Sequence, residues 1–225
     1  MNSMNKRVLL VNDDAFELMT LGEVLGLRGI NIVGSAKTPL AAESLFRTLR
    51  PDVAVVDVRF NAYSGVALTN QMRSISPGLG VVLTTSCSDL RLLGVADSEI
   101  ADSTIIVLKR SIGDIDVLCD AIQNSPNAKV DDAKVVWVNR FPLLQENAHM
   151  EIVQRLTNIQ INTLRLVAEG LSNGEIAKIR FVSEKSVEQI VARIALHMGI
   201  ESNRRRNLRV LMTNEFNRWV GSHKS

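Results

Sequence analysis

The chain has 225 residues, of which 46% are hydrophobic and 22% charged, and its formal net charge is +2. This length suggests one large or two ordinary domains, with enough apolar residues for a buried core. Only Cys87 and Cys119 occur, without a C-x-x-C motif, so neither a disulfide scaffold nor a zinc site is expected. Free thiols fit the reducing cytoplasm, and no uncharged apolar stretch is long enough to predict a membrane span.

The charge is spread unevenly along the chain. Residues 1–123 hold 11 Lys and Arg against 14 Asp and Glu, whereas residues 155–225 hold 12 against 6. An acidic half joined to a basic half indicates that the basic half binds a polyanion.

Strand and helix patterns alternate through the first 123 residues. Short apolar runs predict strands near residues 7–11, 30–34, 51–57, 80–84 and 104–108. Helical spacing predicts helices near residues 18–29, 38–49, 65–75, 89–96 and 114–122. Five βα units in series predict an α/β fold, a doubly wound five-stranded parallel sheet with helices on both faces.

The alternation stops after residue 123. Residues 124–154 are interpreted as a linker with some local structure, in which 134–138 could be a short strand or the start of a helix. From Leu156 onward the pattern is helical only. We therefore predict a domain at residues 5–123, a linker at 124–154 and a small all-α domain at 155–220.

Acidic side chains stand at the ends of two predicted strands. Asp57 ends the strand Pro51–Asp57, and Asp13 and Asp14 follow the strand at residues 7–11. Open α/β sheets place their ligands at the carboxyl ends of the strands. Carboxylates converging there would be stabilised by Mg²⁺, which prefers hard oxygen ligands, and one of them could act as a nucleophile towards phosphorus.

Residues 5–123 resemble the receiver domain of bacterial response regulators, a flavodoxin-like fold. The resemblance rests on the five βα units and on five side chains at strand ends: Asp13, Asp14, Asp57, Thr84 and Lys109. It implies that a sensor histidine kinase phosphorylates Asp57. It also implies a Mg²⁺ site formed by Asp13, Asp14, Asp57 and the backbone carbonyl of Arg59.

Two further roles follow from the same resemblance. Lys109 would pair with a phosphoryl oxygen, and Thr84 would turn its hydroxyl towards the phosphoryl group and so report its presence. Ile106 stands where the family often has an aromatic ring that moves with that hydroxyl. An aspartate-nucleophile phosphohydrolase is a competing reading, but that class has a second Asp two residues after the nucleophile, where this chain has Arg59.

Residues 155–220 resemble the LuxR-type helix-turn-helix domain of the NarL/FixJ class of response regulators. The resemblance lies in Leu164–Asn173, Glu175–Ala177, Val182–Val187 and Met198–Ile200. In this motif the second helix enters the DNA major groove. Thr157 and Ser183 are plausible helix N-caps, and Gly170 a plausible helix end in the left-handed conformation.

The candidate DNA contacts fall in two groups. They are Lys185, Glu188, Gln189 and Arg193 on the second helix and Arg204, Arg205 and Arg206 before the last one. The expected partners are double-stranded DNA and a second copy of the chain, with no membrane.

A second hypothesis keeps the fold without the DNA. Glu188 and Ile190 stand where the family usually has lysine and histidine, so the domain could instead regulate a partner protein by contact. On either hypothesis the protein is not an enzyme acting on outside substrates. The receiver would promote only its own phosphorylation and dephosphorylation.

Overall fold

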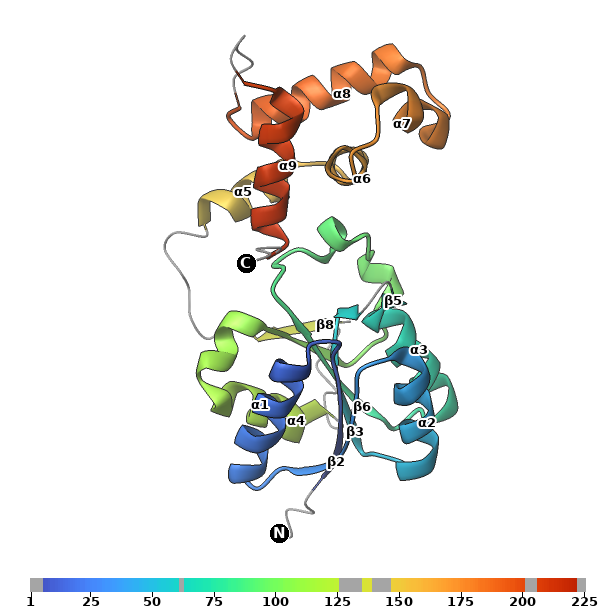
Figure 1. Ribbon diagram of the computed structural model, residues 1–225, viewed down its shortest axis with the longest axis vertical. Helices are drawn as coiled ribbons and strands as arrows, with labels where there is room; N and C mark the ends of the chain where they lie inside the picture. Colours follow the sequence, from blue (N-terminus) through green and yellow to red (C-terminus); the bar gives the residue numbers. More distant parts are fainter. Residues whose placement is uncertain (1–5, 61–62, 126–134, 139–146, 201–205, 222–225) are drawn as a thin grey trace. The chain divides into compact units, whose positions relative to one another are not determined.

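The computed structural model describes residues 6–60, 63–125, 135–138, 147–200 and 206–221. The chain forms two compact units, each of which is drawn in Figure 1. The N-terminal unit comprises Met1–Ser86 and Asp97–Pro142, and the C-terminal unit comprises Cys87–Ala96 and Leu143–Ser225. Ten residues from the middle of the N-terminal sequence therefore fold with the C-terminal half.

A parallel sheet forms the centre of the N-terminal unit, with strand order β2-β1-β3-β6-β7-β8. Its strands are β1 (Arg7–Val11), β2 (Asn31–Ala36), β3 (Val53–Asp57), β6 (Gly80–Thr85), β7 (Thr104–Leu108) and β8 (Val135–Val138). A separate antiparallel pair is made by β4 (Arg59–Phe60) and β5 (Tyr63–Ser64). The predicted α/β class is confirmed, with β8 as a sixth strand.

Helices cover both faces of this sheet (Figure 1). They are α1 (Ala15–Leu27), α2 (Pro39–Leu49), α3 (Gly65–Ile75) and α4 (Ile115–Asn124). Side chains alternate across the strands. Val8 and Leu10 pack in one core cluster with buried residues of α1 and α4, whereas Leu9 lies beside Gly34 and the side chain of Leu49 from α2. The continuous apolar runs of the inner strands are thus explained by burial on both sides.

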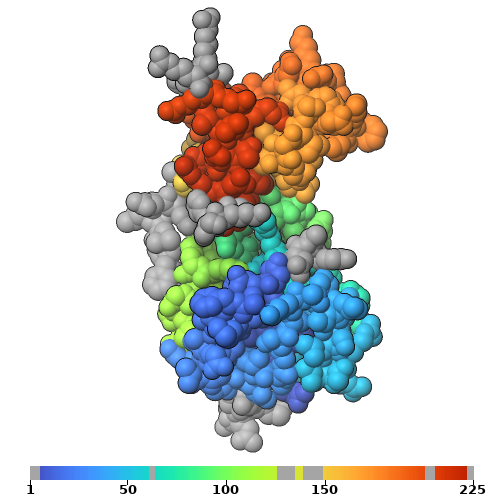
Figure 2. All heavy atoms as spheres, in the orientation of Figure 1, coloured from blue at the N-terminus to red at the C-terminus, as the bar shows by residue number. Residues whose placement is uncertain are grey.

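Polar caps begin these helices. The side chains of Asp14, Thr38, Ser64 and Asp114 accept hydrogen bonds from the first-turn amides of α1, α2, α3 and α4. Capping satisfies amides that have no partner within the helix. In the view of Figure 2, α1 and α2 (blue) form much of the surface of the N-terminal unit. Leu27 of α1 and Leu40 of α2 are exposed to solvent.

The predicted helix at residues 89–96 is wrong. The structure has 3-10 turns, η1 (Leu90–Leu93) and η2 (Asp97–Glu99), with a third, η3 (Lys109–Gly113), after β7. Gly94 ends η1 at φ +79°, a conformation that glycine adopts without steric cost. Leu90 and Leu92 are both buried, a spacing of two that a single face of an α-helix does not bury.

Where the structure describes the C-terminal unit, its regular elements are helical, apart from an isolated bridge residue at Arg206. Its helices are α5 (Asn147–Arg155), α6 (Asn158–Ala168), α7 (Asn173–Arg180), α8 (Glu184–His197) and α9 (Leu208–Trp219). The buried core includes Leu156, Leu164, Val187 and Ile194, together with Phe216 and Trp219 of α9. Trp219 is therefore part of the core of this unit, on the same face of α9 as Phe216.

The caps predicted at Thr157 and Ser183 are present. Thr157 and Gln160 form a reciprocal capping box at α6, and Ser183 caps α8. Ser172 caps α7 in the same way. Gly170 has φ +89°, which suits the end of α6. The stretch predicted as a linker, residues 124–154, contains β8 and most of α5, and the predicted domain boundaries stay predictions.

Candidate functional site

Asp57 is the last residue of β3 and is 6% exposed. Its carboxylate is held from several sides. Oδ1 accepts a hydrogen bond from the Arg59 amide at 2.8 Å, Oδ2 accepts one from Asn12 Nδ2 at 3.4 Å, and Lys109 Nζ forms an ion pair with Oδ2. The ladder places Thr84 of β6 directly beside Asp57. The structure therefore brings together three of the predicted residues: Asp57, Thr84 and Lys109.

Burial is the largest influence on the pKa of this group. It raises the pKa of the Asp57 carboxyl above its usual range, although Lys109 and the Arg59 amide act in the opposite direction. For Lys109 burial acts to lower the pKa, but the negative charges of Asp57 and Glu17 outweigh it and the pKa is raised. A buried carboxylate that is costly to ionise is stabilised by each cation placed beside it.

Glu17 is a member of the site that the sequence reading missed. Its Oε2 lies 2.7 Å from Lys109 Nζ, so the ammonium is shared between two carboxylates. Glu17 is the third residue of α1, whose N-cap is Asp14. The first turn of a helix that follows a parallel strand lies at the carboxyl end of that strand, so the position of Glu17 soon after β1 was the signal available in the sequence.

The two acids that follow β1, Asp13 and Asp14, differ in their surroundings. Asp14 Oδ1 accepts hydrogen bonds from Phe16 N at 2.8 Å and Glu17 N at 2.9 Å, so it caps α1. The side chain that contacts Asp57 is instead that of Asn12, which is 3% exposed. Asp13 is exposed. Within the described ranges, no three His, Cys, Asp or Glu side chains lie close enough together to hold a metal ion.

Gly65 fixes the distance between α3 and the phosphoacceptor candidate. A Cβ atom on Gly65 would lie 2.1 Å from the backbone oxygen of Asp57, and the Gly65 amide donates to Val58 O at 3.0 Å. No side chain can occupy that position without movement of the backbone. The sequence reading treated Gly65 only as the start of a helix.

The second candidate region is the exposed face of α8. Val187, Val191 and Ile194 are buried against the core, while Lys185, Glu188, Gln189 and Arg193 are all exposed on the other side of the helix. Arg206 is also exposed, and Arg204 and Arg205 lie outside the described residues. The structure thus presents four predicted contact residues on one helix surface.

Arg209 positions the helix that precedes α8. Its guanidinium donates to Asn173 Oδ1 at 2.7 Å and to the backbone oxygen of Leu171, and burial lowers its pKa. These bonds tie α9 to the N-terminal end of α7. We therefore assign Arg209 to support of the helix-turn-helix.

Comparison with known families divides the chain in the same way. Residues 8–107 match the response regulator receiver domain, and residues 154–206 match the luxR family of bacterial regulatory proteins. Together the two family models match more than half of the chain. The chain belongs to the response regulators that carry a LuxR-type domain. The predicted family is therefore confirmed.

Known proteins resemble one or both halves. The chemotaxis protein CheY of Thermotoga maritima is 26% identical over 37% of this chain and 69% of its own length. A protein-glutamate methylesterase of Xanthomonas oryzae pv. oryzae is 34% identical over 35% of this chain, but only 22% of that protein is covered.

Solved structures resemble nearly the whole chain. RcsB from Salmonella enterica serovar Typhimurium, bound to a promoter, has a TM-score of 0.53 at 20% identity, with 95% of this chain and 98% of that one covered. An RcsB–DNA complex has a TM-score of 0.54 at 22% identity, with the same shares covered. At this identity the likeness establishes the fold.

Receiver and LuxR-type domains together define a class that regulates and does not turn over outside substrates. In the part of the chain that the structure describes, no helix has the length and apolar character needed to cross a bilayer.

Proposed function

We propose that this chain is a DNA-binding transcriptional regulator that a sensor histidine kinase phosphorylates on Asp57. Phosphorylation would control dimerisation and the binding of double-stranded DNA by the C-terminal unit. The observation that carries the proposal is the buried Asp57 at the end of β3, paired with Lys109 and beside Thr84. The same chain carries a helix-turn-helix whose second helix exposes a polar face.

In the proposed reaction an Asp57 carboxylate oxygen attacks the phosphorus of a phosphohistidine, and the nitrogen–phosphorus bond breaks. Lys109 already faces the carboxylate and would pair with an oxygen of the new acyl phosphate. Thr84 pairs in register with Asp57, and its hydroxyl would donate to another oxygen of the acyl phosphate.

Mg²⁺ would be held beside Asp57 by oxygen donors. The proposed set is Asp13, Asp57 and the backbone carbonyl of Arg59, with Asp14 acting through its cap on α1. Mg²⁺ keeps several waters and needs only one or two carboxylates from the protein, so the set fits it without a third acid. When bound, the ion would neutralise charge on the transferring phosphoryl group.

The DNA-binding role is assigned to the exposed face of α8. Lys185, Gln189 and Arg193 offer donors to phosphates or base edges, and Glu188 an acceptor for a cytosine amino group. Arg204, Arg205 and Arg206 would add phosphate contacts. RcsB dimers bind DNA in a solved structure with a TM-score of 0.53 to this chain, and we propose a homodimer on a two-fold DNA site.

Labelling with radioactive acetyl phosphate and Mg²⁺ tests the receiver half. The wild type should take up label and Asp57→Ala should take up none. Asp52→Ala, which removes an exposed acid just before the opposite end of β3, where it accepts a hydrogen bond from the Arg7 amide, is the matched control and should label normally. Undiminished labelling of Asp57→Ala would show that another residue is the acceptor.

A protein-interaction regulator is the second candidate. It is favoured by the balanced charge of the α8 face, on which Glu184 and Glu188 oppose Lys185 and Arg193, and by Leu196, which is 78% exposed. A mobility-shift assay with random-sequence DNA over a salt series separates the candidates. A shift that weakens with salt supports DNA binding, and none at low salt in either phosphorylation state supports the second candidate.

We further propose that the only chemistry of the chain is its own phosphorylation and dephosphorylation, carried out in the cytoplasm, where chromosomal DNA and reduced thiols such as Cys87 and Cys119 occur together. Release of phosphate from a generic aryl phosphate at many turnovers per protein would contradict this assignment.

A further inference from the structure

Lys109 is the cation of the Asp57 site, and two acids share it. Its Nζ forms an ion pair with Asp57 Oδ2 and lies 2.7 Å from Glu17 Oε2. The side chains of Lys109 and Glu17 are 23% and 27% exposed, whereas Asp57 is buried. An ammonium group has three N–H donors, so two of the three are engaged by carboxylates before any phosphoryl group is present.

The backbone holds both partners of the Glu17–Lys109 pair in place. Asp14 Oδ1 accepts a hydrogen bond from the Glu17 amide at 2.9 Å, which fixes the first turn of α1. Lys109 directly follows β7 and begins η3. In the sheet, β3 and β6 lie between β7 and β1, the strand that leads into α1. The pair therefore joins elements on either side of β3, the strand that ends at Asp57.

The charges of this cluster do not balance. With both acids ionised, Asp57 and Glu17 carry two negative charges against the one positive charge of Lys109. Burial raises the pKa of the Asp57 carboxyl, and the negative charge of Glu17 acts in the same direction. Because one negative charge disfavours another beside it, Glu17 opposes the added charge that a phosphoryl group brings to Asp57.

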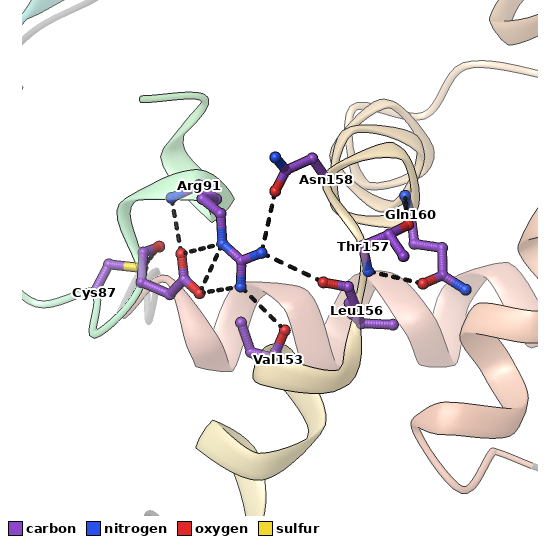
Figure 3. A network of polar contacts seen from close by, with 8 residues as sticks. Cys87, Arg91, Val153, Leu156, Thr157, Asn158 and Gln160 are labelled. Carbon is purple, nitrogen blue, oxygen red and sulfur yellow. Dashed lines mark hydrogen bonds and ion pairs between the residues drawn. The ribbon is translucent and has the colours of Figure 1, made fainter. Parts of the chain in front are cut away.

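Arg91 of the C-terminal unit is a cation with a different set of partners (Figure 3). Its Nη2 lies 2.7 Å from Asp89 Oδ2. The guanidinium also donates to three uncharged oxygens, Val153 O at 3.2 Å, Leu156 O at 3.3 Å and Asn158 Oδ1 at 3.1 Å. In the contacts drawn there, one acid faces one cation, which suits a structural role. The second acid at Lys109 is not needed for charge balance, and it engages a donor that a phosphoryl oxygen would use.

We propose that Glu17 is a positioning residue that holds part of the Lys109 ammonium away from the phosphoryl position and so limits how tightly the site holds a phosphoryl group. In the phosphorylated protein Lys109 would leave Glu17 or divide its donors between Glu17 and a phosphoryl oxygen. Either course makes the acyl phosphate less stable than it would be without this acid. The same negative charge favours a bound Mg²⁺. The inference rests on the proposed phosphorylation of Asp57.

Binding of beryllofluoride, an analogue of the phosphoryl group, and of Mg²⁺ alone tests this inference on the full-length protein. Glu17→Gln removes the charge and keeps the size of the side chain. With Mg²⁺ at saturation for each variant, it should lower the Kd of beryllofluoride about threefold to tenfold, as expected for loss of one half-buried opposing charge. Without beryllofluoride it should raise the Kd of Mg²⁺ about twofold or more, since Mg²⁺ is held by negative oxygen donors. Isothermal titration calorimetry measures both constants.

The opposite signs of the two changes separate electrostatics from folding. Loss of packing or of order around Asp57 would weaken both ligands. Glu23→Gln is the matched control, because Glu23 is an exposed acid of the same helix, and both of its constants should stay within about twofold of the wild type.

A double-mutant cycle tests whether Glu17 acts through Lys109. In a Lys109→Gln background, Glu17→Gln should change the Kd of beryllofluoride by less than about twofold, because the two residues are coupled. If Lys109→Gln binds beryllofluoride too weakly for calorimetry, the rates of labelling of the same four proteins by acetyl phosphate form the cycle. A change as large as in the wild-type background would overturn the role of Glu17 as a positioning residue.

The outcomes distinguish this inference from the proposed function. If the wild type binds beryllofluoride and Glu17→Gln binds it equally well or more weakly, the inference is overturned and the phosphoacceptor assignment survives. Weaker binding of both beryllofluoride and Mg²⁺ would make Glu17 a support of the fold or of the metal, which contradicts the inference in the same way. If the wild type neither binds beryllofluoride nor takes up label, the proposed function itself fails.

Discussion

In the N-terminal unit the charged side chains of the site are buried (Asp57) or half-buried (Glu17 and Lys109) and paired with one another, whereas those on α8 of the C-terminal unit are exposed. Asp57 shares Lys109 with Glu17 in the first case. In the second, Lys185, Glu188 and Arg193 face solvent. A buried network fixes geometry, because any unpaired charge inside it is costly. An exposed set costs little to rearrange, so it suits contact with a long polyanion.

The largest effect is expected from a substitution that disturbs the Asp57 site by steric overlap. Gly65→Ala places a methyl group against the Asp57 backbone oxygen, and overpacking of this kind costs about 1–3 kcal/mol of unfolding free energy. Labelling by acetyl phosphate should fall about tenfold or more, because the carboxylate moves relative to Lys109.

Gly22→Ala is the control for this change. Gly22 lies in α1 with no atom within 4 Å of the position of its Cβ, so alanine there should be neutral or stabilise the protein by up to about 1 kcal/mol. Urea denaturation and labelling should be measured on both variants. Equal behaviour of the two would show that the close approach at Gly65 does not support the site.

An intermediate effect is expected from removal of the buried charge itself. Since the pKa of Asp57 is raised on folding, the folded protein holds this proton more tightly than the unfolded chain. The wild type therefore loses stability as the pH rises from the ordinary Asp pKa through the raised one. Asp57→Asn lacks that loss, so its stability relative to the wild type should increase over this pH range, while Lys109 keeps its bond to Glu17.

Urea titrations of both proteins at several pH values from about 3.5, below the ordinary Asp pKa, up to about 7 measure this difference. Asp52→Asn is the comparison for loss of a carboxylate at an exposed position. A stability difference between Asp57→Asn and the wild type that decreases with rising pH would show that the Lys109 pairing, and not burial, governs Asp57.

The smallest effect on stability is expected on α8. Lys185→Ala should change the unfolding free energy by less than about 0.5 kcal/mol, while the salt dependence of DNA binding should lose about one unit of slope. Glu188→Gln should strengthen binding to random DNA, since it removes a negative charge next to phosphates.

Lys37→Ala removes the same charge from an exposed position of the N-terminal unit and is the control in the mobility-shift assay. A salt slope that is unchanged by Lys185→Ala and altered by Lys37→Ala would place the DNA surface outside α8.

The regular parts of both units could be predicted because their signals are local. The apolar runs that end at Asp57, Thr84 and Leu108 are buried on both faces of one sheet, and strands that run parallel must bring those ends to one edge. The helix-turn-helix was equally predictable, since the side chains of Thr157 and Ser183 accept hydrogen bonds from amides three residues further along the chain.

Other features depended on which groups each residue contacts in the folded protein. Asp13 and Asp14 looked equivalent in the sequence, but the geometry of the first turn engages Asp14 as a cap and brings Asn12 to Asp57. The sequence at Lys134–Val138 was compatible with a strand or with the start of a helix. Pairing with the free edge of β7 favours the strand, and the structure has β8 there.

Interactions within a few positions specify the order of strands and helices, the residues at the carboxyl ends of the strands and the caps of the helix-turn-helix, which is why they could be predicted. The folded chain adds the partners of Lys109, the contact of Gly65 with Asp57 and the place of Cys87–Ala96 in the C-terminal core. Those contacts join residues far apart along the chain, and no spacing pattern in the sequence records which distant surfaces will meet.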